Sequence, residues 1–403
     1  MAMFQDFSIN ILVMDDEHFM LKLISEILRK LGYTNVKTCS SGHIALDILS
    51  DTQNMPDLIL LDLNMPEMDG IEFLRHLEEK HYVGSVLLIS GEDERMMHSA
   101  EQLVLGHNIS TLGYIKKPFG PNELSKHLIN WTAKQSPKVY GSKKVYSAEE
   151  VGAAISNNEL INYYQPKVNL INGQVMGVES LVRWQHPRDG IVFPDQFIGI
   201  AEDSGLIDSL TTCVIQNAFI QSETWRLDKL SLNIAINISM DNLSTFEFVD
   251  RLGELANRHN ISPENIMLEV TESRLMKELS TTQEVLARLR LKRYGLSIDD
   301  FGTGHSSLVQ LRNFPFNELK IDQSFVHGVA KNDTLSAIFK SSLGLAQQLD
   351  MKTVSEGVED LDDWNYVKNS GCDFAQGYFI AKPMPANEIY EWVVKWENDV
   401  ANL

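Results

Sequence analysis

Cysteine is scarce in this sequence. Only three of its 403 residues are cysteines, Cys39, Cys213 and Cys372, and no two of them form a CxxC pair. Thiols spaced this widely are typical of reduced cysteines, so no disulfide framework is expected. Long apolar runs are also missing, because no segment approaches the roughly 20 apolar residues that cross a bilayer. The N-terminal segment lacks the basic start of a signal peptide. We therefore expect a cytoplasmic protein without a membrane partner.

Basic residues are outnumbered by acidic ones. There are 35 lysines and arginines against 55 aspartates and glutamates, and the formal net charge is −20. A surface this acidic disfavours a nucleic-acid partner, which requires a basic face. The 43% of hydrophobic residues is typical of a globular protein. Since an ordinary domain has roughly 100–200 residues, we expect one small and one large domain.

Short apolar segments alternate with helical patterns in the first third of the chain. Apolar runs at 9–14, 57–62 and 85–90 are each followed by apolar residues at helical spacing. This alternation predicts an α/β fold with a doubly wound parallel sheet. In such a sheet the functional site lies beyond the carboxyl ends of the strands.

Polar residues of related chemistry follow these predicted strands. They are Asp15, Asp16, Asp62, Ser90 and Lys117. Carboxylates that converge on one edge offer the oxygen ligands that Mg²⁺ prefers, and a hydroxyl and a lysine nearby suit a phosphoryl group. Asp15 and Asp16 alone are equally well explained as acids at a helix start. The full set favours a phosphoryl site with one Mg²⁺.

Residues 8–133 resemble a response-regulator receiver domain, and "LDLNMPEMDG" is the most specific motif. The resemblance implies a flavodoxin-like fold, a phospho-acceptor at Asp62 and a sensor histidine kinase as partner. It further implies Mg²⁺ binding by Asp15 and Asp16, a switch pair of Ser90 and Tyr114, a phosphoryl contact from Lys117, and a cis peptide at Lys117–Pro118.

A second αβ rhythm follows a linker predicted at 134–147, where the periodicity breaks. Eight strand candidates within 148–398 fit a (β/α)₈ barrel of the TIM type. The first two are joined by the tight turn "NLINGQV" (169–175), which suggests a hairpin. We therefore expect one antiparallel strand in an otherwise parallel barrel.

Each predicted barrel strand ends near a polar residue, on the face where barrel active sites lie. In chain order these residues are Gln165, Glu179, Arg183, Asn237, Glu269, Glu272, Asp299, Asp300, Lys320, Asp322, Glu356 and Gln376. Any one of them is readily explained as a cap or a solvated acid, but the whole series is not. Oxygen ligands without thiols or clustered histidines favour Mg²⁺ or Mn²⁺ over zinc.

The adjacent pair Asp299–Asp300 indicates two metal ions. Like charges disfavour joint ionisation, whereas two cations about 3.5–4 Å apart would make Asp299 a bridging ligand. Two-metal sites suit phosphoester hydrolysis, and Arg183 and Lys320 would add positive charge at the phosphoryl oxygens. The run "GTG" (302–304) is a weaker match to a phosphate loop, since it lacks the lysine and helix of that motif.

Residues 148–398 resemble the EAL-domain family of cyclic-di-GMP phosphodiesterases. The motifs that carry the resemblance are "VESLVRW", "NIS", "LEVTES", "DDFGTG", "LKID", "SEGVE" and "QGYFIAKP". The resemblance implies hydrolysis of cyclic-di-GMP to linear pGpG, inhibition by Ca²⁺, and a homodimer or higher homo-oligomer.

The same resemblance implies roles for single residues. Glu179, Asn237, Glu269 and Asp299 would bind one ion, with Asp300 and Glu356 on the second. Lys320 would orient the attacking water, Glu356 is an alternative general base, and Glu272 would anchor the loop after Asp300. Substrate would be bound by Gln165, Arg183, Asp322 and Gln376.

Three positions depart from the family pattern: Ser180 replaces an alanine, His305 a tyrosine, and Ser355 is less usual before Glu356. His305 titrates near neutral pH, so we expect either a pH-sensitive loop or a residue that only packs.

Three rival functions remain. An EAL barrel that binds cyclic-di-GMP without turnover is disfavoured by the intact set of ligands. A DNA-binding regulator would need a third domain, and an unrelated barrel lyase or isomerase would not need a receiver. Product analysis after incubation with Mg²⁺ and cyclic-di-GMP separates these alternatives.

Overall fold

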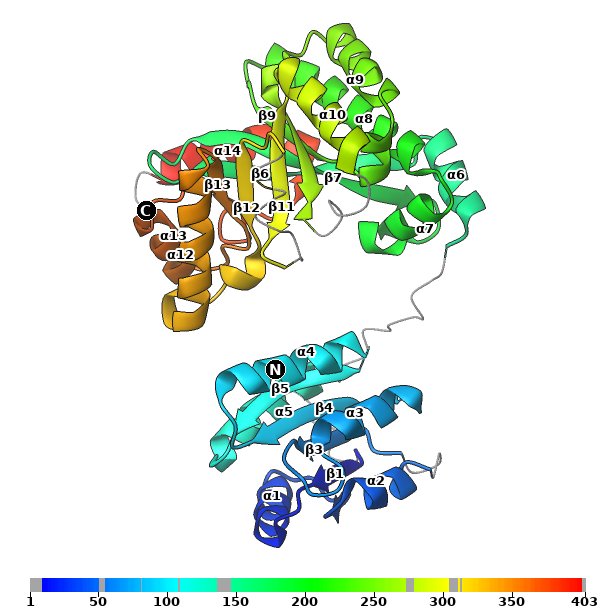
Figure 1. Cartoon of the computed structure of the whole chain (residues 1–403), viewed down its shortest axis with the longest axis vertical. Helices are drawn as coiled ribbons and strands as arrows, with labels where there is room; N and C mark the ends of the chain where they lie inside the picture. The colour runs from blue at the N-terminus through cyan, green and yellow to red at the C-terminus, as the bar shows by residue number, and fades with distance from the viewer. Residues whose placement is uncertain are drawn as a thin grey trace. The chain divides into compact units, whose positions relative to one another are not determined.

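The computed structural model describes residues 9–50, 55–80, 82–107, 109–135, 146–272, 279–303, 311 and 314–400. The chain forms two compact units, Met1–Ser142 and Lys143–Leu403 (Figure 1). Each unit has its own hydrophobic core. None of the helices within these described ranges is long and apolar enough to cross a lipid bilayer.

The first unit contains a five-stranded parallel sheet. Its strands are β1 (Ile11–Met14), β2 (Val36–Cys39), β3 (Leu58–Asp62), β4 (Ser85–Ser90) and β5 (Ser110–Lys116), in the order β2-β1-β3-β4-β5. The helices between and after them are α1 (His18–Lys30), α2 (Gly42–Ile48), α3 (Gly70–Glu79), α4 (Glu94–Gly106) and α5 (Pro121–Gln135). The predicted doubly wound fold is confirmed.

Both faces of this sheet are covered, as the unbroken apolar strands require. In β1, Ile11 and Val13 belong to a core shared with α1 and α5. Leu12 and Met14 point the other way, into a core shared with α2, α3 and α4. Because side chains alternate along a strand, the four apolar residues of β1 serve both layers. This sandwich leaves the carboxyl edge of the sheet for polar side chains.

The second unit is a closed eight-stranded barrel. Its strands are β6 (Leu160–Asn169), β7 (Val175–His186), β9 (Asn233–Asn237), β10 (Ile266–Thr271), β11 (Gly295–Phe301), β12 (Glu318–Ile321), β13 (Lys352–Ser355) and β14 (Phe374–Ala375). Strand β6 runs antiparallel to both β7 and β14, while the remaining pairs are parallel. The predicted single antiparallel strand is therefore confirmed. Two short strands are added to this sheet by antiparallel pairing. Strand β8 (Gly190–Val192) pairs with β7, and β15 (Met384–Pro385) pairs with β6.

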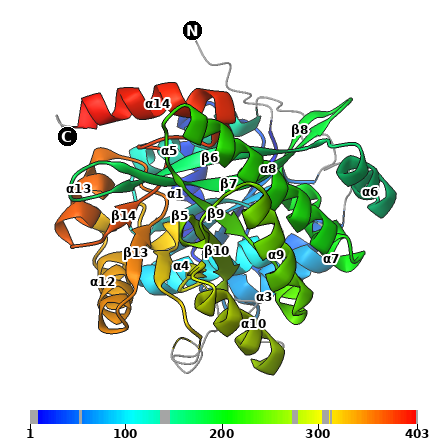
Figure 2. The same cartoon turned by 90° about the horizontal axis from the view of Figure 1, so that it is seen from above.

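Helices surround the barrel strands (Figure 2). They are α6 (Ala148–Ser156), α7 (Ile198–Asp203), α8 (Ile207–Leu227), α9 (Glu247–Arg258), α10 (Leu279–Leu291), α12 (Asp333–Gln348), α13 (Leu361–Asn369) and α14 (Ala386–Asp399). Short 3₁₀ turns lie at η1 (Pro194–Gln196), η2 (Met240–Ser244), η3 (Pro263–Asn265), η5 (Gln323–Phe325) and η6 (Val329–Lys331).

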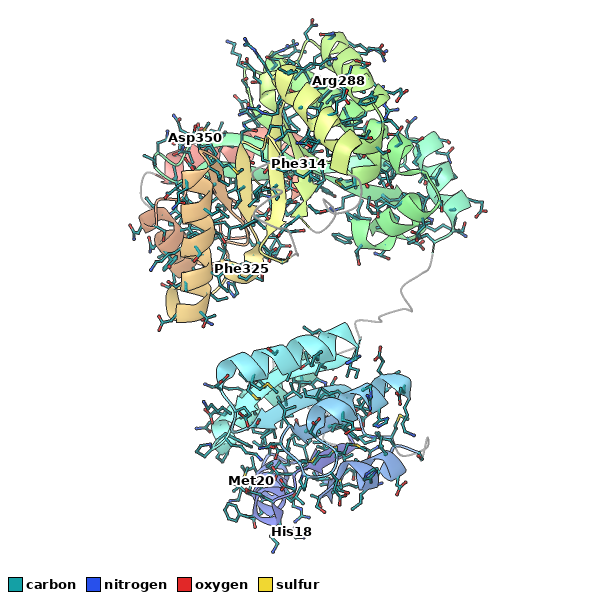
Figure 3. All side chains as sticks on the ribbon, viewed as in Figure 1. His18, Met20, Arg288, Phe314, Phe325 and Asp350 are labelled. Atoms are coloured by element: carbon teal, nitrogen blue, oxygen red, sulfur yellow. The ribbon has the colours of Figure 1, made fainter. Side chains whose placement is uncertain are left out.

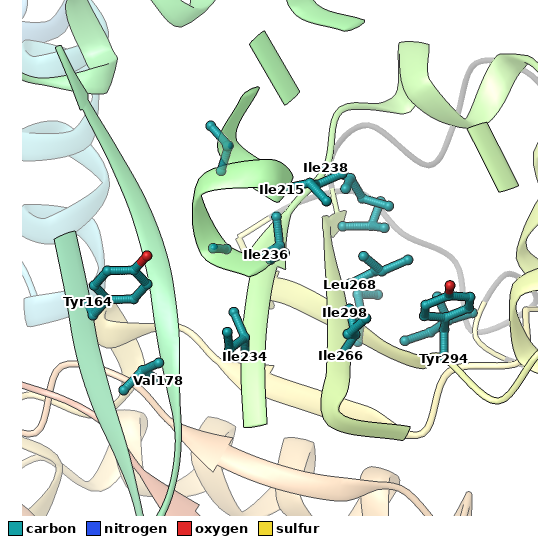
Figure 4. Packing of buried hydrophobic residues seen from close by; sticks show 14 of the residues in the cluster. Tyr164, Val178, Ile215, Ile234, Ile236, Ile238, Ile266, Leu268, Tyr294 and Ile298 are labelled. Carbon is teal, nitrogen blue, oxygen red and sulfur yellow. The ribbon is translucent and has the colours of Figure 1, made fainter. Parts of the chain in front are cut away.

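The barrel strands divide their side chains between two environments. Ile234 and Ile236 of β9 lie beside Ile266 and Leu268 of β10 in the core between strands and helices (Figure 4). Glu269, which lies between Leu268 and Val270 in sequence, points into the barrel and contacts Lys320. Strands β11 and β12 repeat this alternation, so their outward residues are apolar and their inward residues are polar. The period of two thus collects charged groups in the barrel interior.

Candidate active site

The barrel interior is organised around the ammonium group of Lys320 on β12. Four carboxyl groups from four other segments surround its Nζ atom: Glu356 Oε1 at 2.8 Å, Asp299 Oδ1 at 2.9 Å, Glu269 Oε2 at 3.0 Å and Glu179 Oε2 at 3.5 Å. The Lys320 side chain is only 1% exposed. The predicted strand-end residues of β7, β10, β11, β12 and β13 therefore meet at one point.

Lys320 keeps its proton in this position. Burial alone would lower the pKa of the ammonium group, but the carboxylates of Asp299, Glu179, Glu269 and Glu356 raise it well above its ordinary value. A permanently protonated lysine donates hydrogen bonds and supplies charge, and it does not act as a base at neutral pH.

The carboxyl groups around Lys320 have too little positive charge near them. Burial raises the pKa of Glu269 well above its ordinary range and that of Glu356 to about 8. Burial and the charge of Asp299 raise the pKa of Asp300 to about 6. The single ammonium group of Lys320 does not supply enough positive charge to ionise all of these carboxyl groups.

Glu179 differs from its neighbours because it has more partners. Asn237 Nδ2 donates to its Oε1 at 2.7 Å, and Gln376 Nε2 donates to its Oε2 at 2.6 Å. Burial alone would raise the pKa of Glu179, but Lys320 and these two amides together lower it. Glu179 therefore stays ionised more readily than Glu269 and Glu356.

The backbone at the end of β11 brings two consecutive aspartates to one site. Successive residues of a regular strand point to opposite faces, but the pairing of β11 with β12 shifts between Ile298 and Phe301. Asp300 has a φ of 54°, a conformation that only a few per cent of non-glycine residues adopt. Carboxylate oxygens of Asp299, Asp300 and Glu356 consequently lie within 4.8 Å of one another.

The segment after Asp300 is held by a hydrogen bond and passes close to Phe325. The backbone N–H of Gly302 donates to Glu272 Oε2 at 2.6 Å. Gly302 has a φ of 101°, and a Cβ atom there would lie 2.7 Å from the ring of Phe325, which Figure 3 labels. Only glycine fits this position. His305, two residues beyond the last described residue of this segment, lies outside the described residues.

A pocket of about 320 Å³ opens beside this cluster. The residues predicted to bind substrate, Gln165, Arg183, Asp322 and Gln376, all line it. Gln376 Nε2 also donates to Gln165 Oε1 at 2.9 Å. Asp322 accepts a hydrogen bond from the backbone of Ser324 at 2.9 Å and thereby caps η5.

The prediction that all these residues sit at strand ends is wrong for the hairpin. Gln165 lies in the middle of β6 and pairs with Glu179 in the middle of β7. Glu179 in turn pairs with Ala235 near the end of β9, because β6 and β7 are longer than the parallel strands. Sequence reasoning also missed Tyr163 and Phe193, whose rings lie next to Arg183. The alternation of Tyr163 with Gln165 was the available signal for the first.

The first unit carries a smaller acidic site. Lys117 Nζ contacts Asp15 Oδ2 at 2.6 Å and Asp62 Oδ2 at 2.8 Å. Carboxylate oxygens of Asp15, Asp16 and Asp62 lie within 4.8 Å of one another. Burial raises the pKa of Asp62. For Lys117, burial alone would lower the pKa, but hydrogen bonds to the two aspartates raise it.

The remaining predicted residues of the first unit lie on neighbouring strands. Ser90 ends β4 and is fully buried, whereas Tyr114 lies within β5 and is partly buried. The peptide bond between Lys117 and Pro118 is cis, as the resemblance implied. The residue types required by a phosphoryl site therefore occupy one edge of the sheet.

The two folds and sites define the class of protein. The family model of the EAL domain matches residues 148–383, and that of the response regulator receiver domain matches residues 11–129. The first match covers more than half of the chain. The chain belongs to the EAL-domain family and carries an N-terminal receiver domain, which confirms both resemblances.

Particular relatives share this architecture in whole or in part. The cyclic di-GMP phosphodiesterase RocR of Pseudomonas aeruginosa is 31% identical over 386 residues, which cover 95% of this chain and 98% of RocR. The cyclic di-GMP phosphodiesterase PdeR of Escherichia coli is 34% identical over 243 residues, which cover 60% of this chain and 37% of PdeR. A solved structure of the PaMucR phosphodiesterase in complex with c-di-GMP is 37% identical, covers 60% of this chain and 98% of its own, and has a TM-score of 0.57.

Proposed function

We propose that this protein is a cyclic-di-GMP phosphodiesterase that hydrolyses its substrate to linear pGpG, under the control of phosphorylation at Asp62. The observation that carries the proposal is the cluster of carboxyl groups around Lys320, next to a pocket lined by Gln165, Arg183 and Gln376. The names of RocR, PdeR and the PaMucR complex support the same substrate.

The donor set fits two divalent cations. Four carboxyl groups contact a single ammonium group, and burial raises the pKa of Glu269, Asp300 and Glu356. Hard cations such as Mg²⁺ and Mn²⁺ prefer these oxygen ligands. We assign Glu179, Asn237, Glu269 and Asp299 to one ion and Asp300 and Glu356 to the second. When bound, such ions activate water and stabilise charge on phosphoryl oxygens.

The protein side chains have complementary roles in this proposal. Lys320 stays protonated, so it orients the attacking water and stabilises negative charge near the phosphoryl group. Glu356 is the candidate acceptor of the proton from that water. Glu272 supports the reaction indirectly, because it holds the backbone of Gly302 after the aspartate pair. Arg183, Gln165, Asp322 and Gln376 bind the parts of the dinucleotide that do not react.

The receiver supplies the regulatory input. Asp62 accepts the phosphoryl group from a sensor histidine kinase, with Mg²⁺ bound by Asp15, Asp16 and Asp62 and with Lys117 at the phosphoryl oxygens. Ser90 and Tyr114 form the switch pair. We propose functional domains at 8–133 and 148–398, a cytoplasmic location and a homo-oligomeric state, in accordance with this signalling role.

The direct test is product analysis. Purified protein is incubated with cyclic-di-GMP and Mg²⁺ or Mn²⁺, and nucleotides are separated by chromatography. We expect pGpG with either ion and inhibition by Ca²⁺, whose longer bonds and looser geometry misplace the reacting groups. Glu179→Ala should lower turnover by at least about 1,000-fold, and Glu264→Ala, an exposed acid outside the cluster, is the control. Binding of cyclic-di-GMP without any pGpG would establish the receptor alternative instead.

A further inference from the structure

Arg183 is a buried cation without a counter-ion among the described residues. Arg183 is 8% exposed. None of the ion pairs in the described part of the chain includes it. Its hydrogen bond there is from Nη1 to the carbonyl oxygen of Val182, at 2.8 Å. Burial lowers the pKa of its guanidinium group. A buried charge of this kind is costly unless it is paired. The other N–H donors of the guanidinium group can bind an anionic or carbonyl oxygen of a ligand, which would offset this cost.

Two aromatic rings flank this guanidinium group. Its Cζ atom lies 5.0 Å from the ring centroid of Phe193 and 5.6 Å from that of Tyr163. Both distances are within the range of cation–π interactions. Stacking restricts the plane of the guanidinium group, while its N–H edge stays free for hydrogen bonds.

Tyr163 and Arg183 lie on the neighbouring antiparallel strands β6 and β7, and Phe193 directly follows the next strand, β8. Tyr163 on β6 pairs with Leu181, so it lies diagonally opposite Arg183 on β7. Val192 of β8 pairs with Trp184, which places Phe193 opposite Arg183 on the other side. This arrangement belongs to the hairpin and its extension β8, which a regular (β/α)₈ barrel does not have. The hairpin therefore builds a surface for Arg183 as well as closing the barrel.

The position of Arg183 indicates which part of the ligand it serves. It lies four residues along β7 from Glu179, which corresponds to about 13 Å in an extended strand. Both residues line the same pocket. An arginine this far from the carboxylate cluster contacts a part of the ligand remote from the reacting phosphate. Such contacts are equal in the ground state and the transition state, so their loss raises KM and leaves kcat unchanged.

We infer that Tyr163 and Phe193 are positioning residues that hold Arg183 for an acceptor oxygen of the dinucleotide remote from the scissile phosphate. Phe193 is 52% exposed, and an exposed phenylalanine beside a ligand pocket is readily explained by this role. The inference rests on the proposed function, because the ligand it invokes is cyclic-di-GMP.

The experiment is a double-mutant cycle on the full-length protein. Phe193→Leu should raise KM for cyclic-di-GMP by about 3- to 10-fold with kcat within twofold of the wild type, and Phe193→Trp, which keeps an aromatic face, should stay within twofold for both constants. Tyr163→Phe should have little effect and Tyr163→Leu a larger one, because the ring and not the hydroxyl makes the contact. In an Arg183→Ala background, Phe193→Leu should raise KM no further.

A matched control and a second ligand complete the test. Phe246 stacks on Arg288 at 5.4 Å on the helical surface and is 39% exposed, so Phe246→Leu removes a similar pair away from the pocket and should leave KM unchanged.

Cyclic-di-AMP has the same phosphates but lacks the guanine O6 atom. If Phe193→Leu weakens competition by cyclic-di-AMP equally, Arg183 contacts a phosphate; if it spares that competition, Arg183 contacts guanine.

Two results would overturn the inference. One is an unchanged KM in Phe193→Leu and Tyr163→Leu, and the other is an equal increase of KM with and without Arg183. Both results can be obtained only if the wild-type protein hydrolyses cyclic-di-GMP. If the wild type itself forms no pGpG, the proposed function has failed instead.

Discussion

The two units of this protein both place a lysine among carboxylates at the carboxyl ends of strands, but with different enclosure. Lys117 contacts two aspartates and its side chain is 19% exposed, and the third acid, Asp16, is exposed. Lys320 contacts four carboxyl groups and its side chain is 1% exposed. An open site suits a phosphoryl group that arrives on another protein, whereas an enclosed site suits chemistry on a bound small molecule.

The difference in enclosure changes what each lysine does for stability. At the more open site, water reaches Lys117 and Asp16 and weakens their interactions. In the barrel, the carboxyl groups have few other partners, and their raised pKa values reflect this shortage of positive charge. We therefore expect Lys320 to contribute more to the stability of the ion-free barrel than Lys117 contributes to that of the receiver.

The largest difference is expected when each lysine is replaced by methionine. Breaking a buried ion pair costs about 3–5 kcal/mol, so Lys320→Met should strongly destabilise the barrel in EDTA, and excess Mg²⁺ should restore part of the loss. Lys117→Met should cost the receiver about 1–2 kcal/mol. Urea unfolding followed separately for the two units measures both effects. Equal losses in the two variants would contradict the contrast between the sites.

The pH dependence of the ion-free barrel is the next largest effect. Folding raises the pKa of Glu356 to about 8 and that of Asp300 to about 6. The folded state therefore binds more protons than the unfolded state, and its stability falls as pH rises from about 4 through 8. We expect a loss of at least about 1 kcal/mol between pH 5 and pH 8 in EDTA.

Two variants test the origin of this pH dependence. Glu356→Gln should flatten the part between pH 6 and pH 8, since an amide does not titrate. Glu359→Gln, which replaces an exposed acid of the same segment, should leave it unchanged. A barrel whose stability rises over this pH range would show that these carboxyl groups are ionised without cations.

How much of this contrast can be predicted from the sequence depends on the element. The strand-end acids Asp15 and Asp62 and the lysine Lys117 follow directly from the βα rhythm, because parallel strands of a doubly wound sheet end at one edge. The barrel and its hairpin follow from eight apolar segments and one tight turn. In both units the fold class was therefore accessible from periodicity alone.

Other features depend on backbone geometry that a sequence pattern does not encode. Alternation predicts that Asp299 and Asp300 point apart, and only the register shift and the positive φ of Asp300 bring them together. The level of Gln165 in the barrel follows from its pairing with Glu179 of β7. The stacking of Phe193 on Arg183 requires β8, which the sequence analysis did not identify.

A smaller effect is expected from the link between the units. Beryllofluoride bound at Asp62 should change the rate of pGpG formation by a few-fold in the wild type and leave Asp62→Ala unchanged. The physical reason is that a phosphoryl group adds about two negative charges and strong acceptor oxygens beside Lys117. The measurement is the initial rate with and without the mimic, with its binding verified by fluorine NMR. An unchanged rate with the mimic bound would separate the two sites functionally.

The smallest effect concerns Ser180, beside Glu179. Its hydroxyl oxygen is buried and has no hydrogen-bond partner among the residues that the structure describes, and such a group costs about 1–3 kcal/mol. Ser180→Ala should therefore stabilise the barrel by about 0.5–1 kcal/mol without changing kcat more than twofold. Thermal unfolding measures this gain. The comparison variant is Ser342→Ala, which replaces a buried serine on α12. Destabilisation by Ser180→Ala would indicate that the hydroxyl has a partner.

The central claim is that the open site takes one divalent cation and the enclosed site takes two. Equilibrium dialysis against Mn²⁺, with substrate present, counts the bound ions per chain. The account predicts about three ions in the wild type, two in Asp15→Asn and one in Asp299→Asn, because Asp299 would be a ligand shared by both barrel ions. A wild-type chain with one bound ion, or an Asp299→Asn variant that still binds three, would contradict it.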